Sequence, residues 1–167
     1  GLMPGDPVDA ATTLAPMARE DLRDELHKQV EESAAEGAVI VTGGYPLKRD
    51  GAYYAATILD KVEPGHRAYR EELFGPVAIV IRARDESDAI RIANDSEFGL
   101  GGSVWTADNA RGEAAARRVQ SGCCFVNGMV KSDPRLPFGG IKNSGYGREL
   151  SLLGIREFVN AKTIWIR

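Results

Sequence analysis

The sequence predicts an α/β fold: an open, mostly parallel sheet with flanking helices, a long C-terminal loop and a final strand. The nearly continuous apolar run "PVAIVIRA" at 76–83 has the length of a strand and is typical of one that helices cover on both faces. From there to residue 128, strand-like and helix-like segments alternate, which predicts right-handed βαβ crossovers. Residues 128–150 are rich in glycine and proline and predict the long loop.

The first predicted helix covers residues 17–36, which include neither glycine nor proline. Apolar residues recur at every fourth position among charged ones, so one stripe of this helix is apolar: Leu22, Leu26 and Val30. Gly37 follows directly and is expected to end the helix. Residues 1–16 hold three prolines and are expected to form an irregular entry segment.

Two predicted strands come next. "AVIVTGG" at 38–44 indicates a short buried strand that runs into a glycine turn. "YYAATILDKV" at 53–62 indicates either one long strand or a strand pair, because β-branched and aromatic residues dominate it.

The alternation continues after the apolar run. "DESDAIRIAND" at 85–95 predicts a helix with Asp85 or Ser87 as its N-cap. Three further segments are a strand at 101–108, a helix at 109–122 closed by Gly122, and a strand at 123–128. A short helix near 151–158 and a last strand at 162–167, "KTIWIR", complete the chain.

The long loop at 128–150 is expected to be ordered. Loops of more than about 15 residues in compact domains are usually functional or disordered. Large apolar residues recur through this one: Leu136, Phe138, Ile141 and Tyr146. We therefore expect an ordered surface that lines a pocket at the C-terminal ends of the strands, where open α/β sheets bind ligands.

Composition narrows the function classes. The chain has 167 residues, 43% hydrophobic and 27% charged, as one globular domain would. The net charge is −3 and the basic residues are scattered, which argues against nucleic acid as a partner. No apolar stretch approaches the ~20 residues of a membrane span, and two adjacent cysteines favour a reducing compartment, so we expect a cytoplasmic protein without membrane contact. Because the chain begins without Met, we expect it to start partway through a larger protein.

The motif "EELFGPV" at 71–77 places two carboxylates before an aromatic residue, a glycine and a proline. One interpretation is a charged turn that precedes a strand. The other is a binding role, in which a carboxylate accepts hydrogen bonds from paired hydroxyls, such as those of a ribose, and the phenyl ring packs against a flat heterocycle.

Cys123 and Cys124 lie in an apolar strand, far in sequence from the two histidines, His27 and His66. A reactive thiolate needs a nearby base or positive dipole, so buried structural thiols are the favoured interpretation. These residues do not have zinc-ligand spacing, so no metal site is predicted. "GGIKNSGYG" at 139–147 matches neither the Walker nor the dinucleotide phosphate loop. For Arg148 and Glu149 we expect a structural ion pair or helix cap.

Four motifs together resemble the C-terminal part of the NAD(P)-dependent aldehyde dehydrogenases. They occur in the same order and at the same spacing: "EELFGPV" (71–77), "ANDSEFGLGGSVWTAD" (93–108), "GCCFVNG" (122–128) and "PFGGIKNSGYGRELSLLGIREFVNAKTIWI" (137–166). The resemblance covers essentially the whole chain. It is closest to the succinate semialdehyde dehydrogenases, in which a serine is similar in placement to Ser132, five residues before Pro137. A serine hydroxyl suits a substrate that ends in a carboxylate.

The resemblance implies a role for each matching position. Glu72 matches the residue that hydrogen-bonds the nicotinamide-side ribose of NAD or NADP, and Phe74 the residue beside the nicotinamide. Ser132 and Phe138 match positions of the substrate tunnel, and Glu149 a carboxylate of a proton path, although a structural role for it stays open. Residues 1–158 would then be part of the catalytic domain. Residues 159–167 would be an oligomerisation strand that pairs with a neighbouring subunit of a homo-oligomer.

The chain also departs from the family pattern. It has no Gly-Gln-x-Cys motif, and neither Cys123 nor Cys124 aligns with the family's nucleophile, so no catalytic residue is assigned to it. In the family, a thiolate attacks the aldehyde, a hydride passes to the nicotinamide, and water hydrolyses the thioester. We therefore expect this chain to be inactive alone. The alternative is a truncated, non-catalytic module that acts as an assembly or binding partner.

Overall fold

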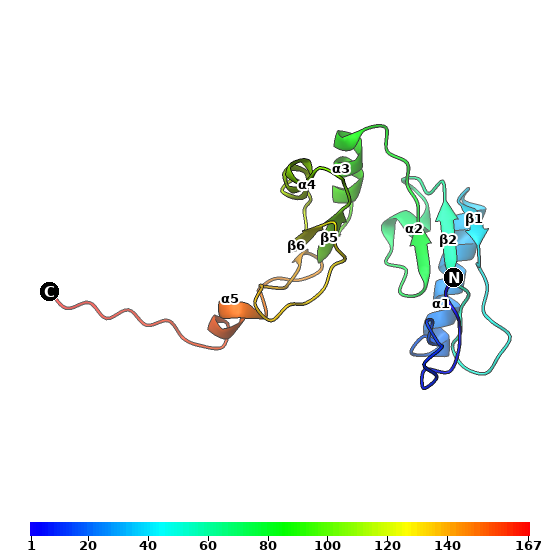
Figure 1. Cartoon of the computed structure of the whole chain (residues 1–167), viewed down its shortest axis with the longest axis horizontal. Coiled ribbons are helices and arrows are strands. Elements are labelled where there is room, and N and C mark those ends of the chain that lie inside the picture. The colour runs from blue at the N-terminus through cyan, green and yellow to red at the C-terminus, as the bar shows by residue number, and fades with distance from the viewer. The chain divides into compact units, whose positions relative to one another are not determined.

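The computed structural model describes all residues from 1 to 167, and the chain divides into two compact units. Unit 1 comprises residues 1–82 and unit 2 residues 83–167 (Figure 1). Both units contain helices and strands, so the predicted α/β class is confirmed. No helix is both long enough and apolar enough to cross a membrane.

Unit 1 is built on a three-stranded sheet. Its elements are α1 (Glu20–Ala35), β1 (Val39–Thr42), β2 (Thr57–Asp60), α2 (Arg67–Arg70) and β3 (Val77–Ile79). The sheet order is β1-β2-β3, with β1 antiparallel and β3 parallel to β2. Leu59 sits at the centre of the sheet, paired with Ile40 on one side and Ile79 on the other.

Helix α1 forms the core of unit 1 with β2. Leu26 and Val30 are fully buried against Leu59 and Tyr54, as the apolar stripe predicts. The helix ends where glycine was expected to end it, because Gly37 has a φ of 122°, which residues with a Cβ rarely adopt. Two polar residues of the same helix, Gln29 and Ser33, are buried as well.

Unit 2 consists of shorter elements. They are α3 (Glu86–Asn94), β4 (Phe98–Gly99), β5 (Gly101–Val104), α4 (Asn109–Ala116), β6 (Cys123–Val126), β7 (Ile141–Lys142) and α5 (Ser151–Arg156). Strands β5 and β6 pair in parallel through α4, which confirms a βαβ arrangement, and β4 pairs antiparallel with β7. Asp85 caps α3 by accepting the backbone N–H of Asp88 at 2.8 Å, as predicted.

The prediction of one open, mostly parallel sheet is wrong. The strands form three small sheets, and two of the four pairings are antiparallel. The strands are also shorter than their apolar runs: only Val77–Ile79 of the run 76–83 is strand. Strand β1 was expected to be buried, but all four of its residues are exposed. Apolar side chains favour burial, but no element of unit 1 buries the residues of this strand.

Two C-terminal predictions also change. The loop at 128–150 is interrupted by β7, which uses Ile141 to pair with Gly99. The segment 162–167 is not a strand in this chain, and it follows α5 as irregular, exposed backbone (Figure 1). A strand needs a neighbour for its N–H and C=O groups, and this segment pairs with no other part of the chain.

Candidate functional site

The turn at 71–76 connects α2 to β3 and rests directly on the core of unit 1. A Cβ at Gly75 would lie 2.4 Å from Cδ2 of the buried Leu26, so any larger residue here would force that leucine to shift. Two short-range backbone bonds shape the turn, from Gly75 N to the Leu73 carbonyl at 2.9 Å and from Val77 N to the Gly75 carbonyl at 2.8 Å. The turn is therefore anchored at its glycine.

The two adjacent acids of this turn have different environments. Glu71 accepts hydrogen bonds from Arg67 Nε and from Gln29 Nε2, each at 2.8 Å. The Glu72 carboxylate is exposed and makes no hydrogen bond or ion pair, while its backbone carbonyl accepts from Gln29 Nε2 at 3.3 Å. Glu71 thus belongs to the protein's own polar network, and Glu72 keeps its acceptor oxygens available.

Electrostatics reinforces this difference. Arg67, and then Gln29, hold the pKa of Glu71 below its ordinary value, because both donate hydrogen bonds to the ionised carboxylate. The same ion pair raises the pKa of Arg67. At neutral pH the Glu71 carboxylate is therefore ionised, and it is already hydrogen-bonded to Arg67 and Gln29.

Phe74 stands two residues beyond Glu72 and is 71% exposed. A phenyl ring this exposed contributes little to the core of unit 1, and it offers a flat apolar face to a ligand. A cavity of about 800 Å³ has Gly75 and Pro76 in its lining, together with residues of β1, β2 and β3. The turn thus carries an exposed carboxylate and an exposed aromatic ring, and its residues Gly75 and Pro76 form part of the cavity wall.

The candidate substrate residues lie in unit 2. Ser132 is exposed, and the next residue, Asp133, forms an ion pair with Arg135 at 2.6 Å. That arginine lowers the pKa of Asp133 to about 2. Phe138 is half-buried, and its backbone exchanges two hydrogen bonds with Glu149, at 2.9 and 2.8 Å, which close the loop between them.

The predicted ion pair or cap at Arg148 and Glu149 is wrong. Arg148 Nη1 donates instead to the carbonyls of Gly140 and Gly147, at 2.9 and 2.6 Å. The carboxylate of Glu149 is exposed without a partner, and α5 begins two residues later with no side-chain cap. Carbonyl oxygens of the glycine loop compete for the guanidinium because they lie within its reach.

The cysteines are half-buried and unpaired in β6. Burial raises the pKa of both thiols, and Cys123 Sγ lies 3.5 Å from the Leu100 carbonyl, which it can reach as a weak donor. Thiols with raised pKa values are protonated and weakly nucleophilic at neutral pH. Their environment supports the structural interpretation, with partial rather than full burial.

Sequence reasoning missed the polar residues that fix the turn. Gln29 and Ser33 are buried on α1, and Arg67 on α2 joins three carboxylates. A signal was present, since polar residues of α1 recur three or four positions apart on one helix face: Glu25, Gln29, Glu32 and Glu36. Their partners lie at residues 67–72, far along the chain, so the sequence alone does not identify them.

The four candidate residues divide between the units. Glu72 and Phe74 share one turn of unit 1, and Ser132 and Phe138 share one loop of unit 2.

Sequence comparison matches residues 1–164 to the aldehyde dehydrogenase family. The chain is 51% identical, over 97% of its length, to a succinate-semialdehyde dehydrogenase [NADP(+)] of Mycobacterium ulcerans. It is 49% identical, over 96% of its length, to a succinate semialdehyde dehydrogenase [NAD(P)+] of Escherichia coli.

Solved structures agree. A succinic semialdehyde dehydrogenase of Streptococcus pyogenes in complex with NADP+ matches 99% of the chain with a TM-score of 0.96 and 39% identity. A betaine aldehyde dehydrogenase of Staphylococcus aureus in complex with NAD+ matches 94% with a TM-score of 0.90 and 32% identity. The chain spans 35% of the length of the two curated relatives, and 36% and 32% of these two structures. With a match along nearly all of its residues, this chain belongs to the aldehyde dehydrogenase family.

Proposed function

We propose that this chain is part of an NAD(P)-dependent aldehyde dehydrogenase that oxidises succinate semialdehyde to succinate. The observation that carries the proposal is the unpartnered carboxylate of Glu72, two residues before an exposed Phe74, in a chain about half identical to succinate semialdehyde dehydrogenases. The share of the relatives that the chain spans supports its being one part of a longer enzyme.

The residues of the turn fit a nicotinamide nucleotide. Ribose hydroxyls are donors, and an ionised carboxylate is only an acceptor, so the free oxygens of Glu72 complement a pair of them. Phe74 offers its exposed ring to the nicotinamide. When bound, the cofactor supplies the acceptor for the hydride that leaves the aldehyde carbon. Glu72 and Phe74 orient that acceptor, which restricts the geometry of transfer.

Ser132 and Phe138 are proposed to define the substrate. Succinate semialdehyde carries a carboxylate at the end opposite the aldehyde, and this group needs hydrogen-bond donors when it leaves water. The exposed hydroxyl of Ser132 is one such donor, and Phe138 supplies an apolar wall for the methylene groups. Betaine aldehyde has a cation at that end, for which a hydroxyl donor gives no comparable preference.

The reactive sulfur is proposed to come from polypeptide outside this chain. Both thiols present are half-buried with raised pKa values, and neither lies in a Gly-Gln-x-Cys motif. Residues 1–158 would then be part of the catalytic domain, and residues 159–167 would pair with a neighbouring subunit. Ile164, Trp165 and Ile166 are all at least 75% exposed here, which supports a role in assembly.

Absorbance of the reduced cofactor tests the proposal. The complete protein that contains this chain should reduce NAD+ or NADP+ with succinate semialdehyde, and faster than with betaine aldehyde at equal concentration. Residues 1–167 alone should give no turnover. A complete protein that ignores succinate semialdehyde would contradict the substrate assignment, and turnover by the 167-residue chain would contradict the division of the active site.

A further inference from the structure

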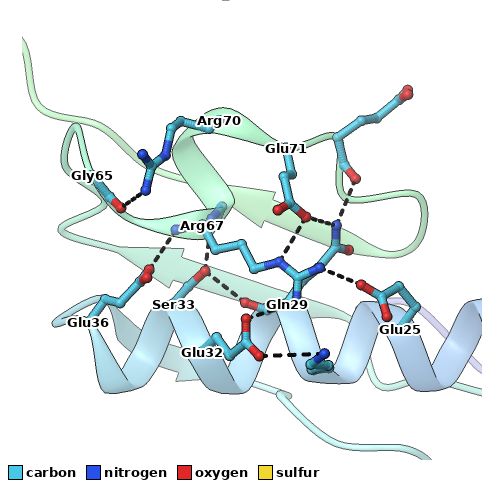
Figure 2. A network of polar contacts seen from close by, with 12 residues as sticks. Glu25, Gln29, Glu32, Ser33, Glu36, Gly65, Arg67, Arg70 and Glu71 are labelled. Carbon is cyan, nitrogen blue, oxygen red and sulfur yellow. Dashed lines mark hydrogen bonds and ion pairs between the residues drawn. The ribbon is translucent and has the colours of Figure 1, made fainter.

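Arg67 is the centre of a polar network that joins α1, α2 and the turn that carries Glu72 (Figure 2). Its guanidinium lies beside three carboxylates: Nε donates to Glu71 at 2.8 Å, Nη1 to Glu32 at 2.9 Å, and Nη2 to Glu25. Its backbone N–H also donates to the Glu36 carboxylate at 2.6 Å. The arginine side chain is only 17% exposed, so these contacts are largely shielded from water.

Gln29 extends this network to the peptide of Glu72. Its amide nitrogen carries two hydrogens, and the two acceptors are the Glu71 carboxylate at 2.8 Å and the Glu72 carbonyl at 3.3 Å. Gln29 is 8% exposed and lies on the buried face of α1. The direction of the Glu72 peptide is therefore coupled to a buried side chain of the core helix.

A second contact of α1 fixes the helix that supports this network. Ser33 Oγ accepts the backbone N–H of Ala68 at 2.8 Å and donates to the Gln29 carbonyl at 2.7 Å. Ser33 and Ala68 are both almost fully buried. Helix α2 is thereby docked on α1, and Arg67 projects from a fixed backbone.

We propose that Arg67 and Gln29 are positioning residues for the cofactor, which hold the 71–76 turn so that the unpartnered carboxylate of Glu72 meets the ribose. The inference rests on the proposed function and adds residues that touch no ligand themselves. When the backbone of Glu72 is already fixed before the cofactor arrives, less conformational entropy is lost on binding. Supporting hydrogen bonds of this kind hold a binding group in its productive geometry.

The balance of charge makes Arg67 the critical member. Without it, the carboxylates of Glu25, Glu32 and Glu71 would face one another without a cation between them. Glu71 would then turn outward, beside Glu72, and repel its charge. An arginine reaches three acceptors in different directions, whereas the single ammonium of a lysine does not, so R67K should recover only part of the effect.

Steady-state kinetics of the complete enzyme tests the inference with Arg67→Met and Gln29→Met. Both variants remove the hydrogen bonds and keep most of the side-chain volume. We expect KM for NAD(P)+ to rise roughly tenfold, the equivalent of one charged hydrogen bond partly lost. KM for succinate semialdehyde should stay within about twofold, because the substrate residues are elsewhere in the chain.

Arg23→Met is the matched control. Arg23 is also 17% exposed, also lies beside a carboxylate, at 2.8 Å from Asp24, and also belongs to unit 1, but it does not contact the turn. A loss of unit 1 stability alone would lower the fraction of active enzyme in either variant without raising KM for the cofactor. A rise in that KM in R67M but not R23M supports positioning.

A double-mutant cycle with Glu72→Ala gives the decisive comparison. If Arg67 and Gln29 act through Glu72, then R67M and Q29M should have no further effect on KM for NAD(P)+ when E72A is already present. Undiminished effects in the E72A background, or a KM for the cofactor unchanged in both single variants, would overturn the inference. A wild-type enzyme without NAD(P)-dependent activity would instead overturn the proposed function, so the two failures are distinguishable.

Discussion

The two units of this chain hold their candidate residues by different means. In unit 1, the turn of Glu72 rests on a packed core, since nearly all buried apolar side chains belong to residues 1–82. In unit 2, the segment 128–150 buries only Gly140. Its close contacts join backbones: a Cβ at Gly122 would lie 1.6 Å from the Gly139 carbonyl oxygen. The turn of Glu72 is thus held by packed side chains, whereas the segment 128–150 is held by close backbone contacts at glycines.

Gly122→Ala should lower the stability of unit 2 more than any other change proposed for this chain. The new methyl group would overlap the Gly139 carbonyl, which is backbone and cannot rotate away, so we expect a loss of more than about 4 kcal/mol. Trp105 directly follows β5 in unit 2, so urea denaturation followed by its fluorescence measures the change. Gly128→Ala is the control, because its nearest heavy atoms are 3.9 Å away. Equal midpoints for the two variants would contradict the account.

Leu26→Ala should have the next largest effect, now in unit 1. The side chain is 1% exposed in the core beneath the turn, and its truncation leaves a cavity that should cost about 3 kcal/mol. Hydrogen exchange of peptides from residues 20–82 measures this loss. Leu152→Ala in unit 2, where the leucine is 59% exposed, should change stability by less than about 0.5 kcal/mol. Similar losses in both variants would show that core packing does not distinguish the units.

Acid should weaken unit 1 through Glu71. The pKa of this carboxyl is lower in the folded chain than its ordinary value of 4.5, so its stabilisation is present above pH 4.5 and is lost as the pH falls through the folded value. The carboxylate is 44% exposed, which limits the contribution to less than about 1 kcal/mol. Glu71→Gln should therefore lose less stability than wild type between pH 5 and pH 3 by hydrogen exchange. Parallel pH profiles would contradict the assignment.

Deletion of residues 159–167 should have the smallest effect on the stability of either unit. All residues of this segment are exposed, and none is in a helix or strand, so we expect a change below about 0.5 kcal/mol. The complete enzyme should nevertheless dissociate into smaller species, as measured by light scattering. An unchanged assembly mass after the deletion would argue against an oligomerisation strand.

The local features of the fold were predictable from the sequence. Gly37 ends α1 and Asp85 caps α3 because both act on backbone groups within one helical turn. The parallel pair β5 and β6 follows from the helix between them. The small sheets, the exposed β1 and the irregular C-terminal segment were not predictable, because apolar patterns do not reveal which part of a protein covers them.

The candidate site shows the same limit. The motif at 71–77 identified the turn, but not which of its two acids the protein uses itself. That depends on Gln29 and Arg67, whose contacts form only when α1 and α2 dock. Likewise, Arg148 binds carbonyls rather than its neighbour Glu149 because the folded glycine loop brings them within reach.

The proposed role of Glu72 in binding the cofactor can be checked in a structure of the complete protein with NADP+, from the distances between the Glu72 carboxylate oxygens and the nicotinamide-side ribose hydroxyls. We predict hydrogen bonds of about 2.5–3.0 Å, with Phe74 packed against the nicotinamide. A ribose bound by other residues, with the Glu72 carboxylate still facing water, would contradict the account.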